Sequence, residues 1–73
     1  MTKVLTNSIR VLRFHQNEMT QQELAKAVKV SRQTIVAIEK GKYSPSLEVA
    51  FKIADVFNVS IADVFSYQAQ VEE

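Results

Sequence analysis

The stretch from Thr20 to Gly41, TQQELAKAVKVSRQTIVAIEKG, decides the fold. Thr20 and Glu23 have the spacing of a capping box, in which each side chain bonds the backbone N–H of the other residue, so a helix is predicted to start there. Ser31 is a second start signal, because its hydroxyl can cap the free N–H groups of a helix. Gly41 follows the last turn of this second helix, as a C′ glycine does. The pattern therefore predicts two short helices joined by a tight turn.

Apolar and polar residues divide these two helices into an inner and an outer side. The apolar residues at helical spacing are Leu24, Ala25, Val28, Ile35 and Ile38. The residues left facing outward at the start of the second helix are Ser31, Arg32, Gln33, Val36 and Ala37. Arg32 and Gln33 carry the paired hydrogen-bonding groups that match guanine and adenine edges in the major groove of DNA. We therefore predict that Arg32 reads guanine, that Gln33 reads adenine and that Val36 touches a thymine methyl group.

The same residues resemble the helix-turn-helix of the Cro/CI repressor superfamily, also called the XRE type. The matching positions are Gln21, Ala25, the run VSRQTI from Val30 to Ile35, and Ile38 and Glu39 before Gly41. Three later segments, 43–47, 51–54 and 63–65, are similar to a branch of small stand-alone regulators of the cytolysin repressor type. The resemblance covers about residues 4–68. It implies an all-α, compact five-helix lambda-repressor-like DNA-binding domain, with a minor two-stranded β-ribbon formed by the termini.

Length and composition limit the classes of function. Seventy-three residues allow one domain, 1–73, in which the helix-turn-helix motif occupies about residues 20–41. The chain has no cysteine, which suits a reducing cytoplasm, and it has one histidine, His15, and no glycine-rich phosphate loop. Its apolar runs are only a few residues long, and its N-terminus lacks the pattern of a signal peptide. We therefore expect a cytoplasmic non-enzyme without membrane association, metal, cofactor or small-molecule ligand.

Charge is distributed unevenly along the chain. The net charge is only +1, but residues 1–43 carry eight Lys and Arg against three Glu, whereas residues 44–73 carry one Lys against five acids. Phosphate binding depends on the local field more than on the total charge. The side of the molecule that holds the helix-turn-helix is therefore predicted to attract DNA, and the acidic side to stay off it.

Three further helices and a ribbon are predicted around the motif. Asn7 is expected to cap a helix that runs to His15 or Gln16, followed by a loop at 16–18 that is one residue longer than in most members of the resembled family. Ser46 is expected to cap a fourth helix after Pro45. The predicted buried face of this helix consists of Leu47, Ala50, Phe51, Ile53, Ala54 and Phe57.

The C-terminal part of the chain predicts a last helix and a strand. Asn58 is expected to end the fourth helix in a left-handed conformation, and the spacing of Ser60 and Asp63 predicts a short helix at about 61–65. Residues 65–71 alternate between apolar and polar side chains, as a strand does, and residues 3–5 are the predicted pairing partner of residues 66–70.

Two residues of the motif need a structural explanation. Lys29 stands where the resembled family most often has glycine, so we expect either a left-handed residue that costs about 1 kcal/mol or a different turn. Glu39 would repel DNA phosphates at the end of the second helix, so it is expected to pair with an arginine of the first helix. The resemblance implies Arg13, with Arg10 as the competing partner and a solvated Glu39 as the alternative.

The remaining predicted sites concern the DNA backbone and a second copy of the chain. Residues expected to position the DNA rather than read its sequence are Gln21, Thr34, Lys40, Lys42 and Tyr43. Apolar residues expected at a homodimer interface, because a short terminal helix cannot cover them all, are Val56, Val59, Ile61 and Val64. The alternative is that these side chains pack within a monomer.

The sequence thus favours a sequence-specific regulator, either a repressor or an autoregulator, that binds a double-stranded DNA operator with a short inverted repeat as a homodimer. The alternative is a protein-interaction module, such as the antitoxin half of a toxin-antitoxin pair. The pair Arg32 and Gln33, with Gln21 and Lys40 around it, favours DNA over a protein partner, because protein interfaces prefer aromatic and aliphatic side chains and are depleted in lysine.

Overall fold

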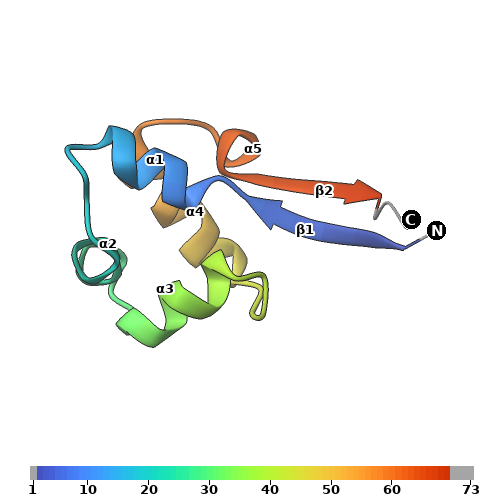
Figure 1. Ribbon diagram of the computed structural model, residues 1–73, viewed down its shortest axis with the longest axis horizontal. Coiled ribbons are helices and arrows are strands. Elements are labelled where there is room, and N and C mark those ends of the chain that lie inside the picture. The colour runs from blue at the N-terminus through green and yellow to red at the C-terminus, as the bar shows by residue number, and fades with distance from the viewer. Residues whose placement is uncertain (1, 70–73) are drawn as a thin grey trace.

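The computed structural model describes residues 2–69. Within this range, five helices lie between two strands in the order β1, α1, α2, α3, α4, α5, β2 (Figure 1). The helices are α1 (Ile9–His15), α2 (Gln21–Val28), α3 (Arg32–Glu39), α4 (Leu47–Phe57) and α5 (Ile61–Val64), and the strands are β1 (Lys3–Asn7) and β2 (Phe65–Ala69). The predicted five-helix fold with a ribbon formed by the termini is confirmed.

Side-chain caps start the helices where the sequence predicts them. The Thr20 hydroxyl accepts the Glu23 N–H at 3.0 Å, and the Glu23 carboxylate accepts the Thr20 N–H at 2.8 Å. The bond from the Thr20 backbone lowers the pKa of the Glu23 carboxyl, because the charged form is the better acceptor. Ser31 and Ser46 accept N–H groups of α3 and α4 at 3.1 and 3.2 Å.

Left-handed residues end helices and close the loops. Lys29 has φ 62° and ψ 44°, so the turn between α2 and α3 keeps its left-handed geometry without a glycine. Asn58 ends α4 at φ 56°, as predicted. Asn17 and Glu18, in the loop expected to be longer than usual, both have φ 54°. Non-glycine residues pay a steric cost in this region, so the chain stores a small strain on both sides of α2.

The start of α1 differs by one residue from the prediction. Ser8, not Asn7, is the N-cap, and its side chain makes no capping bond. Asn7 ends β1, yet its side-chain oxygen accepts the Ile9 N–H at 3.1 Å, and its amide donates to the Ile38 carbonyl at 3.0 Å. Asn7 therefore starts α1 from one position further back and ties it to the end of α3.

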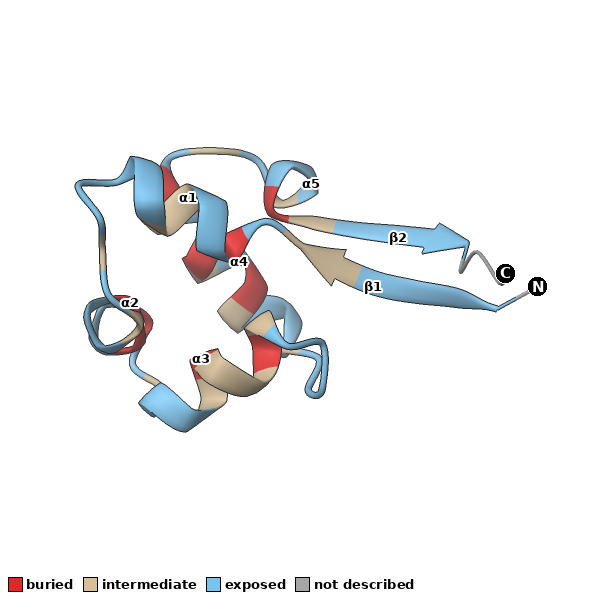
Figure 2. Cartoon of the chain, viewed as in Figure 1, coloured by how far each residue is buried: buried red, intermediate tan, exposed pale blue. Residues whose placement is uncertain are grey.

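The two strands pair the ends of the described chain. They are antiparallel, with Lys3 opposite Ala69 and Leu5 opposite Tyr67, which confirms the predicted pairing partner. The ribbon projects away from the helices (Figure 1), and most of its residues are exposed (Figure 2). Gln70 and Val71, which the sequence places in the same strand, lie outside the described residues.

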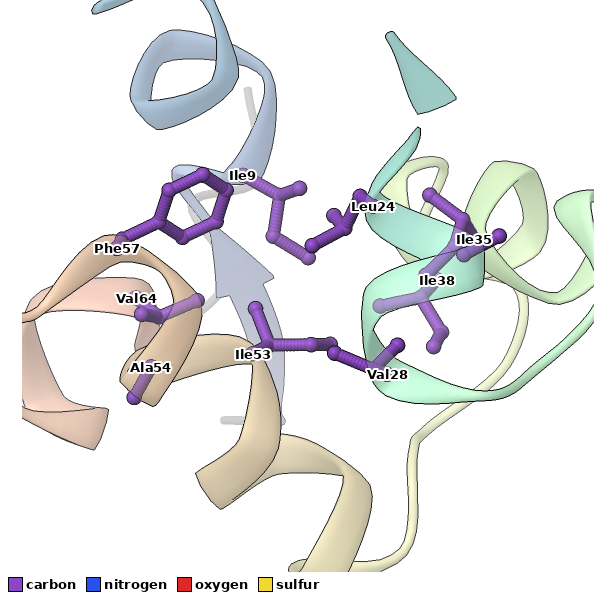
Figure 3. Close-up of a cluster of buried hydrophobic side chains, with 10 residues drawn as sticks. Ile9, Leu24, Val28, Ile35, Ile38, Ile53, Ala54, Phe57 and Val64 are labelled. Carbon is purple, nitrogen blue, oxygen red and sulfur yellow. The ribbon is translucent and has the colours of Figure 1, made fainter. Parts of the chain in front are cut away.

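The core takes apolar side chains from all five helices, which meet at the centre of the helical body (Figure 3). The buried cluster consists of Ile9, Leu24, Ala25, Val28, Ile35, Ile38, Ile53, Ala54, Phe57 and Val64. It holds the two helices of the motif against α1 and α4, which fixes the outward face of α3. Across residues 2–69, no helix combines the length and the apolar character that a membrane span requires.

The predicted buried face of α4 is wrong at two positions. Leu47 is 69% exposed and Phe51 is 53% exposed, whereas the other four predicted residues are buried. Leu47 and Phe51 lie seven and three residues before Ala54, so all three share one side of the helix. The apolar stripe of α4 is therefore wider than the core beneath it, and its edge is open to solvent.

Candidate nucleic-acid interface

The outward face of α3 and the residues beside it form a basic hollow. This hollow, of about 630 Å³, is lined by Gln22, Arg32, Gln33, Val36, Ala37, Lys40 and Lys42. Arg32 and Gln33 are exposed at the start of α3, and Val36 and Ala37 are half-buried one turn later. The lining contains three cationic side chains and no acid. Six of the predicted DNA-binding residues are thus brought together on one surface, with Gln22 beside them.

A second hollow, the α1–α3 cleft, lies on the other side of the same ridge of α3. This cleft, also of about 630 Å³, is lined by Asn7, Arg10, Arg13, Glu18, Met19, Thr20, Gln21, Gln22, Arg32, Val36, Glu39 and Lys40. Arg32, Val36 and Lys40 line both hollows, because residues four and eight apart share one face of a helix. The start of α2, where backbone N–H groups and the helix dipole favour an anion, opens into this cleft.

Glu39 is neutralised inside the α1–α3 cleft. Its carboxylate accepts two hydrogen bonds from Arg13, at 2.7 Å from Nε and 3.1 Å from Nη2. The Gln21 amide donates a third bond at 3.3 Å, and Arg13 also donates to the Met19 carbonyl at 2.8 Å. The pair is the one that the resemblance implies. It joins α1 to the end of α3 and leaves the end of α3 without a free negative charge.

Arg10, the competing partner, makes no salt bridge within residues 2–69. It is exposed on α1 and lies in the wall of the α1–α3 cleft. From the sequence, Arg10 was predicted only as a partner of Glu39, and Gln22 was not predicted to belong to the site. Helical spacing carries a signal for Arg10, since Arg13 follows it by three residues and therefore lies on a neighbouring part of the same face.

Three other predicted DNA-binding residues, Ser31, Thr34 and Tyr43, lie near α3. Ser31 and Thr34 are bonded to each other through their hydroxyls at 2.8 Å, at the start of the helix. Tyr43 is 54% exposed in the connection to α4, where it shares a small cavity with Leu5 and Phe65 of the ribbon. Ile38 of α3 lines the same cavity, so Tyr43 lies where the ribbon meets the end of α3.

The four residues predicted at a dimer interface differ in how far they are buried. Val64 is 1% exposed and belongs to the core of its own chain, so it has no area to offer a second copy, and the prediction is wrong there. Val56, Val59 and Ile61 are half-buried and pack against the core. Val56 lines a shallow groove with Ala27, on the side of α4 that faces α2.

Comparison with known proteins assigns the fold and the motif to a family. Residues 9–64 match the model of a family described as helix-turn-helix. An uncharacterized HTH-type transcriptional regulator of Methanocaldococcus jannaschii is 55% identical over 64 residues, which cover 88% of this chain and 96% of that protein. An uncharacterized HTH-type transcriptional regulator of Archaeoglobus fulgidus is 60% identical over 52 residues, which cover 71% of this chain and 73% of that protein.

Two further matches extend the comparison to a repressor and to a solved structure. The transcriptional repressor RstR of the cryptic phage CTXphi, from Vibrio cholerae, is 36% identical over 63 residues, which cover 86% of this chain and 56% of that protein. The crystal structure of a candidate DNA-binding protein from Bacteroides fragilis superposes with a TM-score of 0.74 at 27% identity, and covers 86% of this chain and 100% of that chain. The family consists of regulators and not of enzymes, as the sequence predicts. The chain belongs to the helix-turn-helix family of XRE-type, DNA-binding transcriptional regulators.

Proposed function

We propose that the protein is a sequence-specific regulator, acting as a repressor or autoregulator, that binds a short inverted repeat in double-stranded DNA as a homodimer. The observation that carries this proposal is the hollow over α3, where Arg32, Gln33 and Lys40 are exposed and no acidic residue is among the lining side chains. In helix-turn-helix docking, the start of the second helix enters the major groove. The similarity to the phage repressor RstR supports the repressor role.

Arg32 and Gln33 are proposed to read the operator directly. Replacing either residue by Ala is expected to relax base preference at one base pair, because a bidentate Arg–guanine or Gln–adenine contact is worth about 1–3 kcal/mol against the wrong base. The operator is first selected from random duplex DNA, and the two variants are then compared by competition binding on single-base substitutions of that operator.

A matched control for this test is Lys52→Ala, because Lys52 lies on α4 in a groove that shares no residue with either hollow at α3. It should retain the base preference of the wild type. Base preferences that remain unaltered in both Arg32→Ala and Gln33→Ala would show that α3 does not read sequence through these side chains.

Lys40 and Lys42 are proposed to hold the DNA backbone at the end of α3. Replacing either by Gln is expected to weaken binding to all sequences about equally, and to reduce the slope of log affinity against log salt by about one, because one fewer counterion is released. Affinity measured at four or more salt concentrations gives this slope. A variant whose slope equals that of the wild type would remove its lysine from the DNA contact.

Gln21, Thr34 and Tyr43 are proposed to support the same backbone contacts. Gln21 opens the first helix of the motif, and its amide already bonds Glu39, so its side chain is fixed beside the N-terminus of α2. A phosphate at that N-terminus would meet free backbone N–H groups. Thr34 lies in the first turn of α3 and Tyr43 in the connection from α3 to α4, and neither contributes a charge.

The proposed dimer forms through what we call the α4–α5 patch: Leu47, Phe51, Val59 and Ile61. Leu47 and Phe51 are more than half exposed, and they share the side of α4 that carries Ala54, which lies beside Val64 of α5 in Figure 3. A two-fold interface buries such a patch against its own copy. It would set two recognition helices about 34 Å apart, which matches successive major grooves.

A protein-interaction module is the second candidate, and one observation favours it. Val11 and Phe14 are 57% and 64% exposed on α1, and neither residue lines the hollow over α3. A salt series separates the two candidates. Binding to DNA weakens steeply as salt rises, whereas an apolar protein contact at α1 does not.

A further inference from the structure

Arg10 lies outside the helix-turn-helix motif, yet it lines the α1–α3 cleft together with residues of the motif. It is exposed on α1, in the wall of the α1–α3 cleft that stands opposite Arg32 and Lys40 of α3. Between these walls lies the start of α2, with Gln21 and Gln22. The cleft is thus a trough with cationic side chains on both sides and a helix N-terminus between them.

The charge of this trough is positive once the internal ion pair is counted. Arg13 and Glu39 neutralise each other through two hydrogen bonds. The other charged residues of the lining are Arg10, Arg32 and Lys40 against Glu18. Within residues 2–69, Arg10 has no carboxylate partner, so its five N–H donors are available to a ligand.

We propose that Arg10 binds a phosphate of the DNA backbone across the cleft from α3, so that one strand is held from both sides of the motif. This inference rests on the proposed function. In helix-turn-helix docking the first helix of the motif crosses the backbone, which brings that strand to the start of α2 and hence to Arg10. A guanidinium matches phosphate oxygens with two parallel hydrogen bonds.

This contact between Arg10 and a phosphate would fix the position of the DNA. It would carry no information on base sequence, because the phosphate is the same at every nucleotide. Removing it should therefore weaken all operators alike. It should also leave the base preferences set by Arg32 and Gln33 unchanged. These two consequences distinguish Arg10 from a residue that reads bases.

The test measures affinity against salt for Arg10→Gln, Lys40→Gln, Arg10→Lys and Lys52→Gln in the full chain. Arg10→Gln is expected to lower the slope of log affinity against log salt by about one. The ratio of wild-type affinity to variant affinity should therefore fall about 3.5-fold between 50 and 200 mM salt. Arg10→Lys keeps the charge and should restore the slope. Lys52→Gln removes one positive charge from a groove on α4 and should leave the slope unchanged.

The possible outcomes separate this inference from the proposed function. If Lys40→Gln lowers the slope and Arg10→Gln does not, the Arg10 contact is refuted while DNA binding stands. If the wild type shows no salt-dependent binding to any selected duplex, the proposed function is refuted, and so is this inference, which rests on it. If Arg10→Gln shifts base preference and keeps the slope, Arg10 reads bases and the phosphate assignment is overturned.

Discussion

Replacing Ile61 by Asp is expected to lower the affinity for a full operator by about 10²–10⁴-fold, while the affinity for an isolated half-site stays close to that of the wild type. Ile61 is half-buried at the start of α5, within the α4–α5 patch. A carboxylate there would be buried against its own copy in a two-fold dimer, and like charges across the axis repel. The monomers that result cannot engage two half-sites together, so the gain from bivalent binding is lost.

The measurement combines sedimentation with binding to the full operator and to half an operator. Phe51→Asp is a second test of the same patch, because Phe51 is 53% exposed and the fold does not depend on its burial. Val11→Asp is the matched control, since it places the same charge on an exposed apolar residue of α1. A wild type that sediments as a monomer at tens of micromolar, or full operator affinity in Phe51→Asp, would show that the interface lies elsewhere.

The local signals in the sequence predicted the helices well, because each is a contact between near neighbours in the chain. Thr20 with Glu23, Ser31 and Ser46 cap their helices through residues three positions ahead, so the spacing alone contains the contact. For Lys29 the sequence left two possibilities, a left-handed residue or a different turn, and the structure shows the left-handed residue. The ribbon followed from the alternation of residues 65–71 and one available partner strand, and the structure shows the pairing for residues 65–69.

Contacts between distant parts of the chain explain what the sequence did not predict. An apolar pattern marks which side of α4 faces inward, but the width of the core beneath it decides that Leu47 and Phe51 stay exposed and that Val64 is covered. Arg10 becomes part of the candidate site only because the fold brings α1 to the same cleft as the start of α2 and the outer side of α3. Asn7 caps α1 from a strand, which depends on how β1 enters the helical body.

Replacing Arg13 by Met is expected to lower the free energy of unfolding by about 3 kcal/mol, at the lower end of the range for breaking a buried ion pair by removing one partner. The side chains of Arg13 and Glu39 are only 15% and 9% exposed, so the unpaired Glu39 carboxylate would stay poorly solvated. The Met19 carbonyl would also lose a donor. For a domain of this size, such a loss lowers the melting temperature by about 12–24 °C.

Two comparisons test whether the loss of stability comes from the unpaired Glu39 carboxylate. The variant with Met at both Arg13 and Glu39 removes both charges and should recover most of the lost stability, because an apolar pair can replace a buried ion pair at little cost. Lys52→Met breaks the exposed pair with Glu48, whose side chains are 44% and 78% exposed, and should cost less than about 0.5 kcal/mol. Thermal and urea unfolding of the four proteins measure these differences. Equal losses in the Arg13 and Lys52 variants would mean that the pair in the cleft contributes no more than a surface pair, and that the core alone holds α3 in place.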